Sequence, residues 1–317
     1  MFFIIICHLG SFFGSDLVGQ FFNVGVPIFF LISGYLYGDK KIRNLNRWIK
    51  MRLIRLYIPL LIWGVVVTSF IIIRGEVLPS IKEYIFFLLN LHGLNFVFYN
   101  MPDLAMGPWF FSVIMLCYFF VVLYQLIERK HENIILIFYY GGIIPLCIQV
   151  VAAYLGVSVP LSFLVGYGLK KRGLLEKQRP YNLFVGIIVF IIAVFLRVVT
   201  KRYIDGTILY DHVIVELSHL MIASAFFIEI RWLFDIIGEN MTEFASSSII
   251  KWLDKISIYV YISHDWFVRD IFELHLPLLI RFIVYFTEVF IVASILYKCG
   301  NKATTLLVAK SMKSMTQ

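Results

Sequence analysis

Long apolar segments separated by short polar loops run along the whole chain. A membrane span needs roughly 20 consecutive apolar residues, so the pattern predicts about ten spans. The predicted spans are residues 1–14, 21–38, 56–73, 109–127, 134–153, 157–169, 181–199, 212–230, 256–274 and 278–297. We interpret residues 77–99, which are apolar but interrupted by charged and amide side chains, as an interfacial or re-entrant segment.

The apolar segments have the continuous character of helices. Barrel strands would alternate apolar and polar residues over about ten positions, and these segments do not. Backbone polar groups within lipid must be satisfied inside the segment, which leaves helices as the structure. The predicted fold is therefore an all-α polytopic integral membrane protein. No linker or convincing repeat divides residues 1–317, so we expect a single domain.

Composition supports a membrane location. The chain is 61% hydrophobic and only 15% charged, whereas ordinary soluble domains carry about 25% charged residues. The net charge of +8 would indicate nucleic acid in a soluble protein, but here it indicates basic loops that fix orientation. We therefore expect contact with membrane lipids and no nucleic-acid partner.

Basic residues are unevenly distributed among the loops. Most of the 28 lysines and arginines lie in alternate loops, the densest of them at residues 40–55. If those loops face the cytoplasm, the distribution follows the positive-inside tendency. This interpretation places both termini in the cytoplasm and the protein in the cell (plasma or inner) membrane as a multi-pass protein.

His8 is the first candidate for chemistry. An ionisable residue inside a bilayer is costly and usually serves a function. Imidazole titrates near neutrality, so His8 could accept and return a proton. The alternative is a histidine that only hydrogen-bonds across the helical bundle.

Arg52 and Arg55 form the second candidate. Residues three apart share a helix face, and guanidinium groups bind phosphates bidentately. The alternative is a basic loop that serves topology or lipid binding. We place the pair roughly 15–20 Å from His8 along the membrane normal, a little over half the hydrocarbon core. A phosphate-headed carrier with a long arm, such as coenzyme A, fits that separation.

Other polar and aromatic residues in the spans are weaker candidates for substrate contact. Glu216 and His219 share a face that must look into the bundle. His264 and Asp265, toward the outer end of the ninth predicted span, either order an acceptor pocket or stabilise the rim. Trp109 either stacks on a substrate or anchors the interface. The four cysteines have no metal-ligand spacing, so we expect no metal.

Several of these elements occur in an order that resembles a known family. His8, the segment 23–35 that ends in Ser33-Gly34-Tyr35, and Arg52-x-x-Arg55 together resemble the membrane-bound acyltransferase-3 family. Elements similar to later ones of that family follow in order at residues 109–111, 163–168 and 257–264.

The resemblance implies an integral membrane O-acyltransferase. Such enzymes transfer an acyl group, usually acetyl, from cytoplasmic acyl-CoA to a hydroxyl of a surface polysaccharide or its polyprenyl-linked precursor. His8 would then be catalytic, and acetyl-CoA would be the co-substrate. Arg52 and Arg55, with the Ser33-Gly34-Tyr35 element, would bind it.

Two other functions remain open at this stage. A transporter or flippase of lipid-linked sugars would also be polytopic, basic inside and aromatic, although the lack of internal duplication disfavours it. The second open function is that of an inactive relative of the family that acts as a membrane scaffold.

The family places a basic residue upstream of the histidine at a position that falls before Met1. Because the first span is also short, we expect it to be truncated at its amino terminus.

Overall fold

The computed structural model describes residues 1–90, 109–128, 160–173, 175 and 180–313, and within these ranges all regular structure is helical. This confirms the all-α prediction for the described part of the chain. The predicted span 134–153 and residues 91–99 of the predicted interfacial segment lie outside the described residues.

Thirteen α-helices and one π-helical turn make up the described chain. The α-helices are α1 (Phe2–Phe12), α2 (Asp16–Phe22), α3 (Gly25–Tyr37), α4 (Leu45–Arg74), α5 (Ile81–Leu88), α6 (Trp109–Glu128), α9 (Pro160–Lys171), α10 (Pro180–Ile204), α11 (Val215–Ile237), α12 (Glu239–Ser246), α13 (Ser248–Ser263), α14 (Val268–Phe272) and α15 (Leu278–Lys313). The π-helical turn, Leu209–Ile214, leads into α11.

Five helical segments of the described chain are long and apolar enough to cross a membrane: α4, α6, α10, α11 with its leading turn, and α15. The protein therefore has the helices of a polytopic membrane protein. The number of ten spans and the cytoplasmic placement of both termini stay predictions.

α4 begins earlier than the predicted span 56–73. The Asn44 side chain accepts a hydrogen bond from the backbone N–H of Arg47 at 2.9 Å and so caps the helix. As a result, Arg52 and Arg55 lie in a continuous helix and not in a loop before it.

The ninth predicted span, residues 256–274, is broken and not continuous. α13 ends at Ser263, a turn follows, and the five-residue α14 begins at Val268. Tyr285 of α15 donates a hydrogen bond to the backbone carbonyl of His264 at 3.0 Å. Tyr285 thus satisfies a carbonyl that would accept a hydrogen bond within a continuous helix. His264 and Asp265 lie in the break between α13 and α14.

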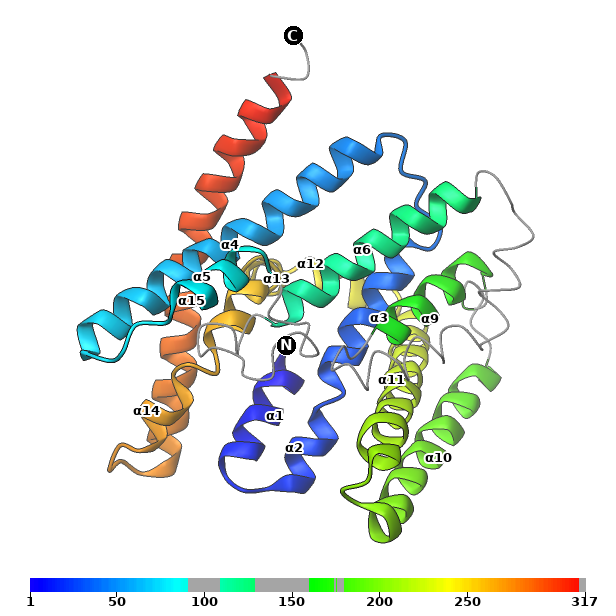
Figure 1. Cartoon of the computed structure of the whole chain (residues 1–317). Coiled ribbons are helices and arrows are strands. Elements are labelled where there is room, and N and C mark those ends of the chain that lie inside the picture. The colour runs from blue at the N-terminus through cyan, green and yellow to red at the C-terminus, as the bar shows by residue number, and fades with distance from the viewer. Residues whose placement is uncertain (91–108, 129–159, 174, 176–179, 314–317) are drawn as a thin grey trace.

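The first two predicted spans form three helices, because the expected loop between them forms α2. α1 and α2 make a short hairpin whose closest approach is at Gly10 and Gly19. A Cβ atom on Gly10 would lie 2.8 Å from the backbone nitrogen of Gly19. Figure 1 shows this hairpin between α14 on one side and the α10–α11 pair on the other.

α3 and α9 cross at a glycine contact. A Cβ atom on Gly34 would clash with the backbone carbonyl of Phe163, and one on Gly166 with the carbonyl of Leu31. Gly38, one turn after Gly34, packs equally closely on the end of α9. Small residues four apart allow helix backbones to approach in membranes, so the glycines fix α3 against α9.

The main apolar core joins α1, α3, α4, α6, α13 and α15. Its largest fully buried side chains include Phe30, Phe111 and Tyr285. In Figure 1, α4 and α6 run diagonally across the upper half, and α15 passes steeply along one side. α10 and α11 form an antiparallel pair at the other side, joined to the rest by a small cluster of Val24, Ala193 and Ile222.

Candidate active site

His8 lies beside the broken ninth segment. Its Nδ1 atom is 3.3 Å from the Asp265 Oδ1 atom, and both side chains are about two-fifths exposed (41% and 43%). The ring of His264 packs edge-on against the ring of His8, with centroids 4.9 Å apart. The fold therefore brings together three residues that the sequence singled out separately.

His264 is held in one orientation. Its side chain is buried, and its Nδ1 atom lies 2.6 Å from the backbone carbonyl oxygen of Tyr261. A carbonyl oxygen only accepts hydrogen bonds, so Nδ1 carries the proton. The Nε2 atom then has a lone pair and no hydrogen-bond partner among the described residues.

The contact with Asp265 determines which ring nitrogen of His8 carries the hydrogen. A carboxylate beside Nδ1 favours the tautomer in which Nδ1 carries the hydrogen. This leaves Nε2 of His8 free to take a proton from a nearby hydroxyl. The geometry is similar to that of a histidine–aspartate pair in which the carboxylate orients the imidazole.

Two cavities adjoin His8. The larger has a volume of about 700 Å³ and the smaller about 280 Å³. His8 and Ser11, one turn apart on α1, line both of them. His8 is therefore placed where two separate ligands can reach it.

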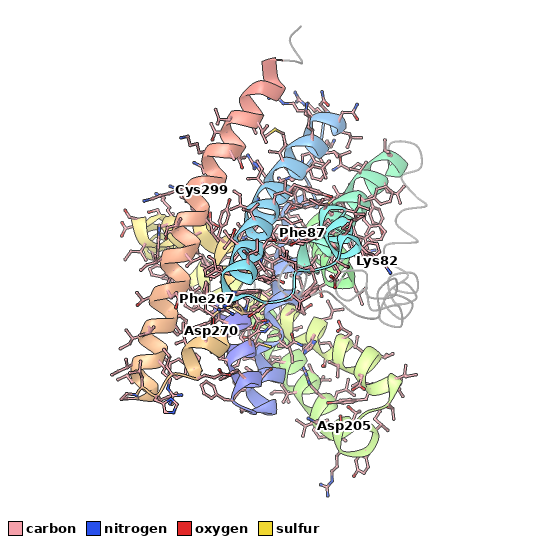
Figure 2. All side chains as sticks on the ribbon, turned by 60° about the vertical axis from the view of Figure 1, so that its left-hand side comes forward. Lys82, Phe87, Asp205, Phe267, Asp270 and Cys299 are labelled. Carbon is pink, nitrogen blue, oxygen red and sulfur yellow. The ribbon has the colours of Figure 1, made fainter. Side chains whose placement is uncertain are left out.

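The larger cavity, which we name the outer cavity, lies where α1, the end of α4, α5 and α14 meet. Its charged side chains are Asp265, Asp270, Arg74, Glu76 and Glu83. Trp63 and Trp266 line the same space. Figure 2 shows Asp270 near Phe267, at the junction of α14 with the rest of the bundle.

The smaller cavity, which we name the inner cavity, lies between the α1–α2 hairpin and the first turns of α3 and α6. Trp109 and Tyr261 line it together with His8, Asn23 and Val26. The structure thus places Trp109, a predicted substrate contact, across a cavity from His8.

Arg52 lies in a cage of three aromatic rings. Its guanidinium carbon is 5.3 Å from the ring centroid of Tyr37, 5.6 Å from that of Trp48 and 5.5 Å from that of Tyr118. Each such contact contributes about 0.5–1 kcal/mol at an exposed site. Stacking uses the faces of the rings and leaves the N–H edge of the guanidinium available for a bidentate acceptor.

Further cations lie at the end of α9 and on the loop before α4. Lys170 forms an ion pair with Asp39 at 3.2 Å, and its ammonium nitrogen is 5.6 Å from the ring centroid of Tyr35. Burial lowers the pKa of Lys171 from its usual value, and the positive charge of Lys41 lowers it further. Cations packed closely enough to repel one another form a surface that favours a polyanion.

α3 and α6 connect the inner cavity to the Arg52 cage. On α6, Trp109 lines the cavity and Tyr118, nine residues later, belongs to the cage; the rise is roughly 14 Å. On α3, Val26 lines the cavity and Tyr37 belongs to the cage, a rise of roughly 16 Å. Two helices thus lead from the inner cavity to the cage, and the separation of Arg52 from His8 along the membrane normal stays a prediction.

The remaining predicted site residues lie elsewhere. Gly34 is used for packing against α9, Ser33 is partly buried beside it, and Tyr35 packs on Phe227 at 4.9 Å. Arg55 is exposed on α4 near the cage residues. Cofactor contact by Ser33, Gly34, Tyr35 and Arg55 stays a prediction.

Glu216 and His219 lie on α11 and do not line either cavity. Glu216 interacts electrostatically with Arg197 of α10, and Arg197 also interacts with Cys7 on α1. Substrate contact by Glu216 or His219 stays a prediction, and the structure does not bring either residue to His8.

Sequence reasoning did not single out the tryptophans and the Arg74–Asp270 ion pair of the outer cavity, or the aromatic rings of the cage. Arg74 and Asp270 are 196 positions apart and form an ion pair. Only tertiary structure brings such residues together. The available signal was the presence of Trp48, Trp63 and Trp266 within or beside predicted spans.

Comparisons with known proteins give one match. The family model described as an acyltransferase domain, of the acyltransferase-3 type, matches residues 1–298. Comparisons with curated proteins and with solved structures give no match. The family match favours an acyltransferase over a transporter of lipid-linked sugars. The chain belongs to the acyltransferase-3 family and is a membrane acyltransferase.

Proposed function

We propose that this protein transfers an acetyl or similar acyl group from cytoplasmic acyl-CoA to a hydroxyl of a cell-surface polysaccharide or of its polyprenyl-linked precursor. The observation that carries the proposal is the position of His8. It pairs with Asp265 and lines two cavities, and α3 and α6 lead from one of these to the caged Arg52.

The donor would bind with its phosphates at the Arg52 cage. The guanidinium group of Arg52 matches phosphate geometry bidentately. Lys40, which lies over the Tyr37 ring, and Arg55 of α4 supply further positive charge. The long arm of the donor would then run along α3 and α6 toward Trp109.

Aromatic side chains fill the stretch between the cage and the inner cavity. Phe30 of α3 and Phe110 of α6 pack with ring centroids 5.3 Å apart, and Phe110 also packs on Tyr261 at 4.9 Å. In our proposal the thioester reaches His8 when these rings move apart. The inner cavity then holds the thioester and the outer cavity holds the acceptor.

The proposed chemical step is general-base catalysis. His8 Nε2 takes the proton of the acceptor hydroxyl while the hydroxyl oxygen attacks the thioester carbonyl carbon. The C–S bond breaks, the ester forms, and the CoA sulfur leaves with the proton returned by His8. Asp265 stabilises the imidazolium between these two events. The route through an acyl group carried on His8 is the alternative, and the Asp265 contact favours the first.

The experiment is a transfer assay with the purified full chain in a lipid bilayer. It uses labelled acetyl-CoA and the surface glycan of the producing cell. We expect His8→Gln to lower kcat by roughly 10²–10⁴-fold, the usual contribution of a general base. The matched control is His275→Gln, because His275 is exposed and lines neither cavity. Wild-type turnover in the His8 variant contradicts the proposal.

A further inference from the structure

The outer cavity carries more negative than positive charge. Of the charged side chains that line it, Asp265, Asp270, Glu76 and Glu83 are carboxylates and only Arg74 is a permanent cation. This is the cavity in which the proposed function places the acceptor. Its charge therefore bears on which acceptors can enter.

Arg74 is not available to bind an anionic ligand. Its guanidinium forms an ion pair with Asp270, and a second contact reaches Glu76 at 3.8 Å. It also lies over the ring of Trp266, with its guanidinium carbon 5.9 Å from the centroid. The cation is thus already matched by two carboxylates.

The other two carboxylates are also fixed in place. Glu83 caps α5 in a reciprocal contact with Ser80: its carboxylate accepts the Ser80 backbone N–H, and its own N–H donates to the Ser80 hydroxyl at 3.3 Å. Asp265 is held by His8. A negatively charged ligand would be placed against fixed like charges, which weakens its binding relative to that of a neutral ligand.

Two tryptophans give the cavity an aromatic corner. The rings of Trp63 and Trp266 stand at 89° to each other with centroids 6.1 Å apart. Trp63 is buried, and Trp266 is partly exposed. Ligand sites combine such apolar faces with a few placed polar groups. An apolar ring face beside carboxylate acceptors suits a molecule with C–H faces and many hydroxyl donors.

We infer that the outer cavity binds a sugar residue that carries no negative charge and excludes uronic acids and other acidic sugars. The inference deepens the proposed function, on which it rests, by naming the class of acceptor. The part of the Trp266 ring that stays exposed beside Arg74 contacts the C–H face of the sugar, and the carboxylates of Glu76 and Glu83 accept hydrogen bonds from its hydroxyl groups.

The test is a competition assay with three matched pairs of sugars. Glucose and glucuronate, galactose and galacturonate, and mannose and mannuronate are added as competitors of acyl transfer to the producing cell's glycan. We expect each neutral sugar to inhibit at concentrations roughly tenfold lower than its uronate. Equal inhibition within the pairs, stronger inhibition by the uronates, or no inhibition by any sugar overturns the inference.

Variants connect the preference to the named residues. Glu76→Gln with Glu83→Gln removes two charges but keeps the acceptor oxygens, and glutamine still supports the helix cap. We expect the neutral-to-uronate ratio to fall toward one. Asp205→Asn is the control, because Asp205 lies at the turn after α10, away from Asp270 (Figure 2). An unchanged ratio in the double variant counts against the assignment.

A second pair of variants tests stacking. Trp266→Leu is expected to raise the KM of the acceptor several-fold with the KM of acyl-CoA unchanged, and Trp266→Phe is expected to recover much of the loss. Trp252→Leu is the control, because Trp252 is exposed on α13 and does not line the cavity. A loss that falls on kcat or on acyl-CoA alone contradicts the stacking role.

The outcomes separate this inference from the function beneath it. If the wild-type chain transfers no acyl group to any acceptor, the proposed function fails. If it transfers acyl groups and does not distinguish neutral from acidic sugars, only the inference about the outer cavity fails.

Discussion

The Arg52 cage and the outer cavity carry opposite charge. At the cage, a guanidinium is held by three aromatic rings, and the ammonium nitrogen of Lys40 lies 5.6 Å from the ring centroid of Tyr37. In the outer cavity, the single guanidinium of Arg74 is outnumbered by carboxylates. A polyanionic ligand would therefore be favoured at the cage and disfavoured in the outer cavity by electrostatics, before any specific contact forms.

The two sites also use aromatic residues differently. In the cage, the rings of Tyr37, Trp48 and Tyr118 surround a cation and leave its N–H edge open. In the outer cavity, the guanidinium of Arg74 is committed to carboxylates, and the ring of Trp266 is partly exposed. The cage therefore presents the charge of Arg52 to a ligand, and the outer cavity presents part of the Trp266 ring.

The largest effect is expected at His8, which lines both the outer and the inner cavity. Asp265→Asn keeps the size of the side chain but no longer selects the productive tautomer of His8. We expect kcat to fall at least 10²-fold, by analogy with the loss of the aspartate in a catalytic triad. The KM values of both substrates should change little. Transfer kinetics with Asp254→Asn, an exposed aspartate on α13, as the control measure this.

The next effect separates donor from acceptor. Arg52→Gln removes a charged hydrogen-bond donor, worth about 1.5–3 kcal/mol. We therefore expect the KM of acyl-CoA to rise roughly 10–100-fold and the KM of the acceptor to stay constant. Arg202→Gln, at the exposed end of α10, controls for general loss of positive charge. A rise in the KM values of both acyl-CoA and the acceptor would mean that the Arg52 cage does not serve the donor alone.

A third test weakens the glycine contact between α3 and α9. Gly34→Val drives a side chain into the backbone carbonyl of Phe163, and overpacking of this kind costs about 1–3 kcal/mol. We expect a lower unfolding temperature and reduced activity with both substrates. Gly186→Val is the matched control, because its nearest neighbour is the flexible Glu229 side chain at 3.3 Å. Equal stability of the two variants contradicts the packing role.

The smallest expected effect is that of salt. Charges near a surface are screened over about 8–10 Å at physiological ionic strength. Raising the salt concentration from 50 to about 500 mM should raise the KM of acyl-CoA a few-fold. The KM of a neutral acceptor should change by less than about twofold, because no charge pair is lost. Steady-state kinetics across this series provide the measurement.

The apolar pattern correctly predicted an all-helical membrane protein, and the order of motifs predicted its family. Helix boundaries were less predictable. The basic residues before the third span look like a loop, but the Asn44 cap starts the helix there. The break at His264 depends on a hydrogen bond from Tyr285, which is 21 positions away and leaves no local signal.

The candidate site shows the same limit. His8, His264 and Asp265 could each be singled out, because ionisable residues in apolar segments are rare. The proximity of His8 to the other two could not be derived from the sequence, because it depends on how α1 packs beside the turn after α13. The outer cavity needs residues from α4, α5 and α14 at once, and no periodicity links them.

α6 forms a rigid connection between the basic loop before α4 and the inner cavity. The Gln125 side chain near its end binds the backbone of the basic loop twice, donating to the Lys40 carbonyl at 2.6 Å and accepting from the Ile42 amide at 3.1 Å. Trp109, at the other end of the same rigid helix, borders the inner cavity. Any tilt of this helix that follows a movement of the loop would shift Trp109 and Phe110 together, so a change at the loop would reach the wall of the inner cavity beside His8.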